Sequence, residues 1–245
     1  MPFTISHIAI VLPLTCRQRP YLSMTGLMIG AMVPDFFYFV LFDPYFDDGH
    51  QWWGIFLYDI PLALLLAFLY HELAKPALIR YLPAWAGARL HHFRYFQWSS
   101  YFRKNYVVVI LSIIAGTLTH FFLDGFTHGH GYYVQLFPFL QGEAVIFGET
   151  MEIWYLMQYL TSAVGLLLLC WFFMRLPRPY LPPEVQGRHK PVFWLLIIVV
   201  ASAILLFYRQ QPHMFRKSMD YLAIVMAAAF YGFFAVVLSQ KLTKL

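Results

Sequence analysis

The chain has 245 residues, of which 60% are hydrophobic and 12% are charged. Because soluble domains carry about 25% charged residues, this composition excludes an ordinary soluble domain and favours a protein embedded in lipid. The net charge of +5 at pH 7 suits either nucleic acid or a membrane surface. The positions of the basic residues favour the membrane, and we expect no nucleic-acid partner.

Along the chain, six apolar segments are long enough to cross about 30 Å of hydrocarbon as helices. They cover residues 22–42, 52–70, 106–124, 154–174, 192–208 and 221–239. Aromatic residues at several segment ends are typical of the boundary between membrane and water. Since the length suits one compact bundle, the sequence predicts an all-α fold. We expect a polytopic transmembrane helical bundle with about six spans, in a single membrane domain over residues 1–245.

Lysine and arginine residues indicate the orientation of this bundle. If the six spans alternate, all of them except Arg209, Arg216 and Lys217 fall on one side of the membrane. Cytoplasmic loops are rich in these residues, so we expect that side, and the C-terminus, to be cytoplasmic. The long connection at 71–105 mixes basic and aromatic residues, which indicates a cytoplasmic interfacial segment on anionic membrane lipid.

Three ionisable residues stand out inside the predicted spans: Asp35, Asp59 and His120. Such residues are costly in hydrocarbon and usually have a function. At a rise of about 1.5 Å per residue, all three lie at a similar depth in the outer half of the membrane. This common depth makes them candidates for one site.

The end of the third span adds further candidates. His120 and Asp124 are four residues apart and therefore lie on the same helix face. An imidazole and a carboxylate at that spacing can bind the same cation. His128 continues this face if the helix persists, and His50 lies in the short outer loop between the first two spans. The sequence predicts a divalent metal site with the ligands Asp35, His50, His120, Asp124 and His128.

Simpler interpretations stay open for these residues. A lone intramembrane histidine is often a hydrogen-bonded packing residue, and a histidine and a carboxylate at this spacing also arise by chance. Asp59 has three interpretations: a metal ligand, a carboxylate that orients a ligating histidine, or a packing residue beside Pro61. We favour the second, because histidine ligands generally donate their other ring N–H to such a partner.

The N-terminal segment at 3–16 is almost wholly apolar and contains His7. We expect it to form a membrane-inserted helix that packs beside the first span, with a basic turn at 17–19 on the inner side. His7 then rises roughly 15 Å and approaches the depth of Asp35. The alternative is an amphipathic anchor with His7 at the cytoplasmic surface.

Several motifs resemble those of an uncharacterised bacterial family of multi-spanning membrane proteins, domain of unknown function 4184. The resemblance covers about residues 1–170, the motif-bearing core, whereas residues 175–245 supply two further spans without a recognised motif. It implies a location in the bacterial inner membrane. The motifs are Met1-Pro2-Phe3-Thr4, Ser6-His7, Val11-Leu12-Pro13-Leu14, Gly30-Ala31-Met32-Val33-Pro34-Asp35, Leu57-Tyr58-Asp59-Ile60-Pro61-Leu62, Thr119-His120, Asp124-Gly125-Phe126-Thr127-His128, and Gln158-Tyr159 with Ser162 and Gly165.

More distantly, the order His, Pro-Asp, His, His-x-x-x-Asp, His is similar to inner-membrane metal-dependent hydrolases and to the zinc-dependent phospholipase C and nuclease P1 group. This resemblance implies zinc ions and hydrolysis of phosphoesters. It implies one complete metal site at Asp35, His50, His120 and Asp124, a second at which His7 joins Asp124, and a third that includes His128. The later His-x-x-x-Glu of those enzymes has no counterpart here.

Taken together, the residues and the resemblance favour a membrane-embedded metal-dependent hydrolase that acts on a lipid-linked phosphoester. Two alternatives stay open. One is a non-enzymatic metal-binding membrane protein or transporter, which would need polar residues through the inner half of the bundle. The other is a structural membrane subunit in which the histidines only pack.

Overall fold

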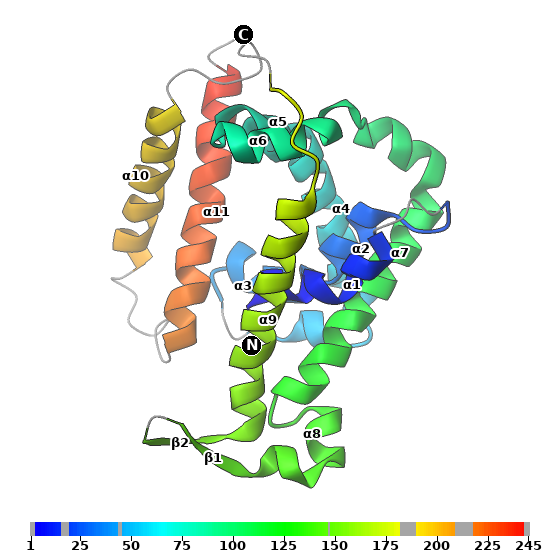
Figure 1. Cartoon of the computed structure of the whole chain (residues 1–245), viewed down its shortest axis with the longest axis vertical. Coiled ribbons are helices and arrows are strands. Elements are labelled where there is room, and N and C mark those ends of the chain that lie inside the picture. Colours follow the sequence, from blue (N-terminus) through cyan, green and yellow to red (C-terminus); the bar gives the residue numbers. More distant parts are fainter. Residues whose placement is uncertain are drawn as a thin grey trace. The chain divides into compact units, whose positions relative to one another are not determined.

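The computed structural model describes residues 3–15, 20–43, 46–146, 148–181, 190–208 and 218–242, and it confirms the all-α prediction (Figure 1). One short hairpin is the only strand structure in the described part of the chain. The chain divides into two compact units. Unit 1 comprises Met1–Asp35, Asp48–Ala63 and Asn105–Arg175, and unit 2 comprises Phe36–Asp47, Leu64–Lys104 and Leu176–Leu245.

Within the described residues, five helices are long and apolar enough to cross a membrane. They are Ile55–Tyr81, Trp98–Thr127 (α7), Ile153–Arg175 (α9), Lys190–Tyr208 (α10) and Tyr221–Leu242, which is most of α11 (Ser218–Leu242). Each matches one predicted span. The first combines η3 (Ile55–Asp59), α4 (Ile60–Leu69), η4 (Tyr70–Ala74) and α5 (Lys75–Tyr81), in which η3 and η4 are π-helical turns.

The predicted span at 22–42 differs from the structure, because it consists of two short helices. α2 covers Met24–Gly30 and α3 covers Val33–Val40, and Ala31 and Met32 between them are not helical. Pro34 explains the break. Proline has no backbone N–H and its ring crowds the preceding turn, so a helix that reaches it from the N-terminal side is interrupted.

The predicted N-terminal helix is present. Thr4–His7 forms a 3-10 turn (η1), and Ile8–Thr15 continues it as α1. Both contact α9, and α1 also contacts α2; Figure 1 shows this segment crossing α9. The predicted basic turn at 17–19 lies outside the described residues.

Close contact between α2 and α7 depends on small residues. A Cβ atom on Gly30 would lie 2.3 Å from the carbonyl oxygen of Ile113, and one on Gly116 would lie 2.4 Å from that of Leu27. Without side chains at these two positions, the backbones of α2 and α7 touch, as in other membrane helix pairs with small residues at the interface. This contact brings the break after α2 against the face of α7 that carries His120.

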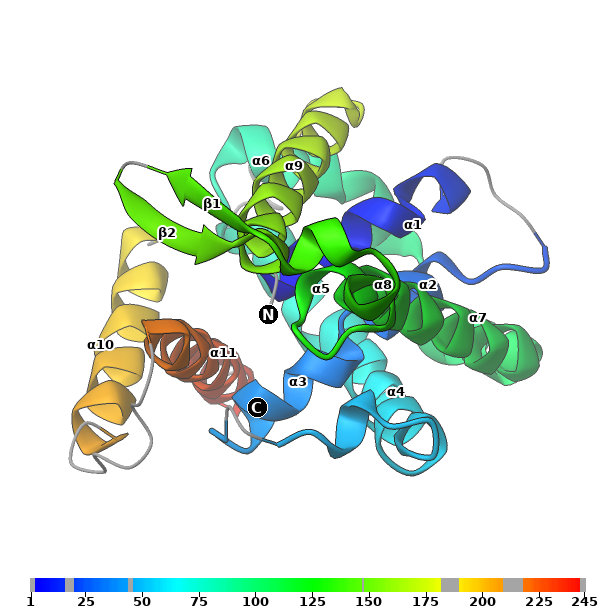
Figure 2. The ribbon, with the colours of Figure 1, turned by 90° about the horizontal axis from the view of Figure 1, so that it is seen from below.

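After α7, unit 1 continues through α8 (Tyr132–Leu136) and η6 (Pro138–Gln141) into an antiparallel hairpin of β1 (Glu143–Ile146) and β2 (Glu149–Glu152) (Figure 2). The side chains of Glu143, Glu149 and Glu152 are exposed. They therefore fit solvated carboxylates rather than metal ligands.

Unit 2 packs α10 and α11 against η4 and α5, which end the span Ile55–Tyr81. The connection from α5 to α7 contains α6 (Ala84–His91) and η5 (His92–Tyr95). Phe193 of α10 is 1% exposed and stacks on Tyr81 with ring centroids 4.1 Å apart. The indole N–H of Trp194 donates to the carbonyl of Tyr81 (3.0 Å).

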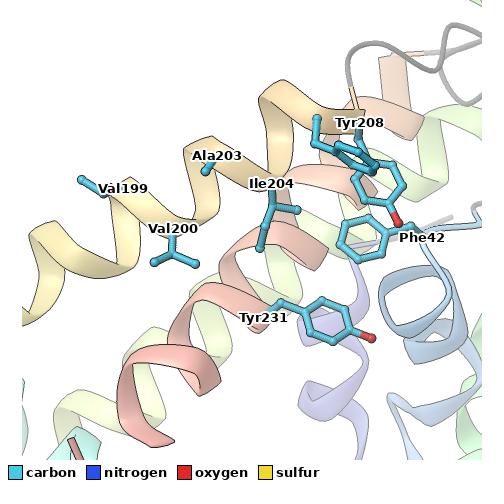
Figure 3. Close-up of a pocket in the computed structure, with 8 residues that line it drawn as sticks. Phe42, Val199, Val200, Ala203, Ile204, Tyr208 and Tyr231 are labelled. Carbon is cyan, nitrogen blue, oxygen red and sulfur yellow. The ribbon is translucent and has the colours of Figure 1, made fainter. Parts of the chain in front are cut away.

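A groove of about 560 Å³ lies on unit 2 beside α10 and α11 (Figure 3). Its lining is aliphatic and aromatic, and the hydroxyls of Tyr208 and Tyr231 are the only polar side-chain groups on it. Since it contains no carboxylate or imidazole, it offers no catalytic chemistry. The candidate site is elsewhere, in unit 1.

Candidate metal centre

Four side chains from three separate parts of unit 1 bring their ligand atoms together. Asp35 lies in the first turn of α3, His50 ends the 3-10 turn Asp48–His50 (η2), and His120 and Asp124 lie one turn apart on α7. One ligand atom of each residue lies within 4.8 Å of those of the other three. The structure thus brings together four of the residues that the sequence selects.

The distances between these atoms suit a tetrahedral ion. His120 Nε2 is 3.3 Å from both His50 Nε2 and Asp124 Oδ2, and 3.7 Å from Asp35 Oδ1. His50 Nε2 is 3.5 Å from Asp35 Oδ1 and 3.6 Å from Asp124 Oδ2. Ligand atoms about 2.0–2.2 Å from a tetrahedral zinc ion lie about 3.3–3.6 Å from one another. The donor set therefore fits such an ion with little rearrangement.

Unpaired buried carboxylate oxygens also favour a cation at this group. Asp35 Oδ1 and Asp124 Oδ1 are buried and have no hydrogen-bond partner among the described residues. An unpaired carboxylate oxygen away from water is costly, and buried carboxylates are normally paired or bound to metal. A cation in this group would remove that cost for Asp35 Oδ1, which faces His50 and His120, whereas Asp124 Oδ1 faces His7.

A backbone carbonyl fixes the ring of His120. His120 Nδ1 lies 3.0 Å from the carbonyl oxygen of Ala31, and a carbonyl can only accept, so Nδ1 carries the proton. In a neutral imidazole, Nε2 then has the lone pair, and Nε2 is the atom that faces Asp35, His50 and Asp124. The side chain is therefore oriented as metal-ligating histidines usually are.

Thr4 orients the carboxylate of Asp35. Its hydroxyl donates to Asp35 Oδ2 (2.8 Å), which leaves Oδ1 facing the two histidines. Thr4 and Asp35 are both buried. The sequence analysis did not select Thr4, although it is a polar residue beside His7 in an otherwise apolar segment.

His7 lies at the edge of the four-residue group. Its ring is fully buried and stacks on that of His120, with centroids 4.0 Å apart. His7 Nε2 is 3.6 Å from Asp124 Oδ1. Both ring nitrogens of His7 lack a hydrogen-bond partner among the described residues. The structure therefore places His7 beside Asp124, whose second oxygen faces the other ligands.

His128 follows α7 directly, and its Nδ1 lies 3.1 Å from the carbonyl oxygen of Asp124 and 3.7 Å from Asp124 Oδ2. Its side chain is 39% exposed. Desolvation lowers the pKa of His128 below its usual value, although the nearby Asp124 carboxylate opposes this shift.

Asp59 ends η3, and its two carboxylate oxygens are buried without a hydrogen-bond partner in the described part of the chain. Its role in orienting a histidine stays a prediction.

Exposure shows from which side the group is accessible. The side chains of His50 and Asp124 are 16% and 12% exposed, whereas those of Asp35 and His120 are at most 1% exposed. Phe121 packs near His50, and Trp52 meets Phe121 edge to face. The group therefore opens past His50 and Asp124, beside aromatic side chains.

The model of a family described as Domain of unknown function (DUF4184) matches residues 1–242. The chain belongs to this family. The match continues through the last two spans, beyond the motif-bearing part at 1–170. No curated protein and no solved structure matches the chain.

Three landmarks of the DUF4184 chain on α9 support the site indirectly. Ser162 Oγ accepts from the backbone N–H of Phe3 (2.8 Å), and Gln158 Nε2 donates to the carbonyl of Thr127 (2.6 Å). A Cβ atom on Gly165 would lie 2.7 Å from that of Ser6. These residues hold the segment that carries His7 and the end of α7 that carries Asp124. Sequence reasoning found the landmarks but not these roles, because the contacts join distant parts of the chain.

Proposed function

We propose that this protein is a membrane-embedded, metal-dependent hydrolase that acts on a lipid-linked phosphoester. The observation that carries the proposal is the group of two carboxylates and two imidazoles with separations suited to a tetrahedral ion. Two nitrogen and two oxygen donors suit zinc among the common divalent ions. When bound, a zinc ion would lower the pKa of a water that joins these four side chains as a fifth ligand, and it would polarise a phosphoryl oxygen.

The residues of the chain have separate parts in this proposal. Asp35, His50, His120 and Asp124 hold the ion, and His7 beside Asp124 Oδ1 extends the ligand set. His128 lies on the exposed side, where its ring is accessible to a substrate. The buried side, at Asp35 and His120, excludes water. A phosphoester therefore approaches past His50 and Asp124.

The shortage of basic residues in unit 1 supports metal dependence. Among its described residues, Arg175 is the only lysine or arginine. Phosphoryl groups are usually held by such residues or by metal ions. Arg175 ends α9, about 25 Å along this helix from Gln158, which contacts the end of α7. Neutralisation of a bound phosphoryl group therefore falls to the ion and the histidines.

The position of the ligands in the chain supports a lipid substrate. His50 precedes the span that begins at Ile55, and His128 follows the span that ends at Thr127. Ligands at the ends of spans lie near the membrane–water boundary, where lipid headgroups reside. With basic loops inside, this boundary is on the outer side of the bacterial inner membrane. A C-terminal fusion to a reporter that is active only in the periplasm tests the orientation, and activity there would contradict it.

The transporter alternative gains no support from α7. Ser112 Oγ accepts from the N–H of Ser23 (2.8 Å), and Thr117 donates to the carbonyl of Gly30 (3.3 Å). Both polar side chains of the inner half are thus engaged by backbone groups, as expected of packing residues.

Metal analysis and hydrolysis assays on the purified protein test the proposal together. We expect bound zinc and zinc-dependent cleavage of a phospholipid in mixed micelles, both lost in His120→Ala. A soluble chromogenic phosphodiester separates lipid specificity from general phosphoesterase activity. Bound zinc without cleavage of any phosphoester would favour the non-enzymatic metal-binding alternative, and absence of bound metal would favour the structural subunit.

A further inference from the structure

The break between α2 and α3 leaves two adjacent backbone carbonyls without their helical donors. In a continuous helix, the carbonyl of Gly30 would accept from residue 34, but Pro34 has no N–H. The carbonyl of Ala31 would accept from Asp35, but the N–H of Asp35 donates to Met32 instead (3.2 Å). Carbonyls buried in protein require other donors.

α7 supplies both donors from one face. Thr117 Oγ1 donates to Gly30 (3.3 Å) and His120 Nδ1 donates to Ala31 (3.0 Å). These two residues are three apart and therefore neighbours on the helix surface. Gly116 lets the backbones meet, because a Cβ atom there would lie 2.7 Å from the backbone nitrogen of Ala31. The spacing of the donors on α7 thus matches the spacing of the freed carbonyls.

We propose that this break positions His120, with Pro34 and Thr117 as positioning residues that act through backbone carbonyls. Pro34 frees the Gly30 carbonyl directly and interrupts the helix, so that the N–H of Asp35 donates to Met32 and leaves the Ala31 carbonyl to His120 Nδ1. Thr117 binds the Gly30 carbonyl and so keeps the break aligned with α7. The ring of His120 then presents its Nε2 lone pair to the ion. This inference rests on the proposed function, because the orientation of His120 matters for ligation only if the four side chains bind metal.

Asp35 gives the break a second consequence. It lies directly after Pro34, in the first turn of α3, and its carboxylate is held by Thr4. One interruption of the backbone therefore sets the positions of two ligands, His120 through the Ala31 carbonyl and Asp35 through the chain itself. A continuous helix through 22–42 would use the Ala31 carbonyl internally and leave His120 Nδ1 without this acceptor.

Zinc affinity of the full-length protein in detergent, measured by competition with a chromophoric chelator, tests the inference. We expect Thr117→Val, which keeps the shape but removes the hydroxyl, and Pro34→Ala, which restores an N–H, each to weaken zinc binding about 10- to 100-fold. Thr117→Ser should bind like the wild type, because it restores the donor. Pro76→Ala is the matched control, since Pro76 is also the second residue of its helix but is exposed and lies in unit 2.

Absorption spectra of the Co²⁺-loaded protein add a readout that general destabilisation would not produce. We expect the visible bands of Thr117→Val to differ from those of the wild type, and those of Thr117→Ser to match it. If the wild type binds zinc and Thr117→Val binds it equally well with an unchanged Co²⁺ spectrum, the inference is wrong and the proposed function stands. If the wild type binds no zinc, both the inference and the proposed function are wrong. If Pro34→Ala does not fold, the Thr117 pair decides.

Discussion

The two units differ in whether their buried charged and ionisable side chains converge on one another. In unit 2, Lys75 donates to the carbonyl of Phe96 (2.7 Å), Arg89 donates to that of Trp85 (2.8 Å), and His71 stacks on Trp98. Buried nitrogens without a hydrogen-bond partner also occur among the described residues of unit 2, at His91 Nε2 and Trp98 Nε1, but they do not join a group of convergent ligand atoms. In unit 1, Asp35 and Asp124 instead converge with histidines and retain buried oxygens without hydrogen-bond partners among the described residues.

This difference separates polar residues that stabilise a fold from those that form a site. A buried polar group that only stabilises is normally satisfied by its surroundings. Unsatisfied groups that converge from three parts of the chain could hold a cation. Burial alone is thus a poor guide to function in a membrane bundle, and the direction in which the side chains point is a better one.

The largest expected effect is the loss of metal in His120→Ala. This change removes the most buried imidazole ligand, and we expect zinc content near zero by elemental analysis. His71→Ala is the matched control, because His71 is also a buried histidine but lies in unit 2. It should keep the wild-type metal content. Equal loss of metal in both variants would mean that the two units do not differ in this respect.

Phe193→Ala should lower the stability of the protein and leave metal binding unchanged, unlike His120→Ala. The side chain is 1% exposed and stacks on Tyr81 within unit 2. Its removal leaves a cavity, and we expect the free energy of unfolding to fall by about 3 kcal/mol. Unfolding in mixed micelles with increasing denaturing detergent measures this. Zinc affinity measured under native conditions should stay unchanged, and a parallel loss would show that the site depends on unit 2.

His7→Ala should weaken metal binding by about tenfold, an effect of the size seen when a supporting group of a metal site is lost. The reason is the 3.6 Å contact with Asp124 and the stacking on His120. The helical content by circular dichroism should not change, because the spans do not include this residue. His130→Ala, at an exposed histidine just beyond α7, is the control. If both variants bind zinc like the wild type, His7 is a packing residue.

Much of the fold and part of the site could be predicted from the sequence, because these features depend on local patterns. Apolar length gave five spans that the structure also has, and helical spacing placed His120 and Asp124 on one face. The break in the predicted span at 22–42 was missed, although Pro34 is its cause. In a bundle, proline inside an apolar run is tolerated when neighbouring helices satisfy the freed carbonyls, and only the structure shows that Thr117 and His120 do so.

Other features depend on contacts between distant residues, which one sequence cannot supply. Two hydrogen bonds join the N-terminal segment to later helices: one from Thr4 to Asp35, and one from the backbone N–H of Phe3 to Ser162. The prediction that His7 reaches the site was possible because the apolar segment around it needs a protein environment. Its stacking on His120 required the structure. The role of Asp59 is still a prediction, since neither the pattern nor the contacts decide it.

The smallest expected effect concerns the surface of unit 2 that lies between two spans. Arg94 is exposed there, 6.0 Å from the ring of Tyr95, in the segment predicted to lie on anionic lipid. Each basic residue near a membrane surface contributes about 1 kcal/mol to the attraction of anionic lipid. We therefore expect Arg94→Gln to weaken binding of fluorescent phosphatidylglycerol to the detergent-solubilised protein about fivefold at low salt. Added salt should reduce the difference in affinity between Arg94→Gln and the wild type, because exposed charges are screened.

Gln97→Ala, at an exposed neutral position of the same segment, should have no effect, and neither variant should change binding of phosphatidylcholine or zinc. If Arg94→Gln and the wild type bind phosphatidylglycerol equally at low salt, the exposed basic residues of unit 2 act in orientation during insertion and not in lipid binding.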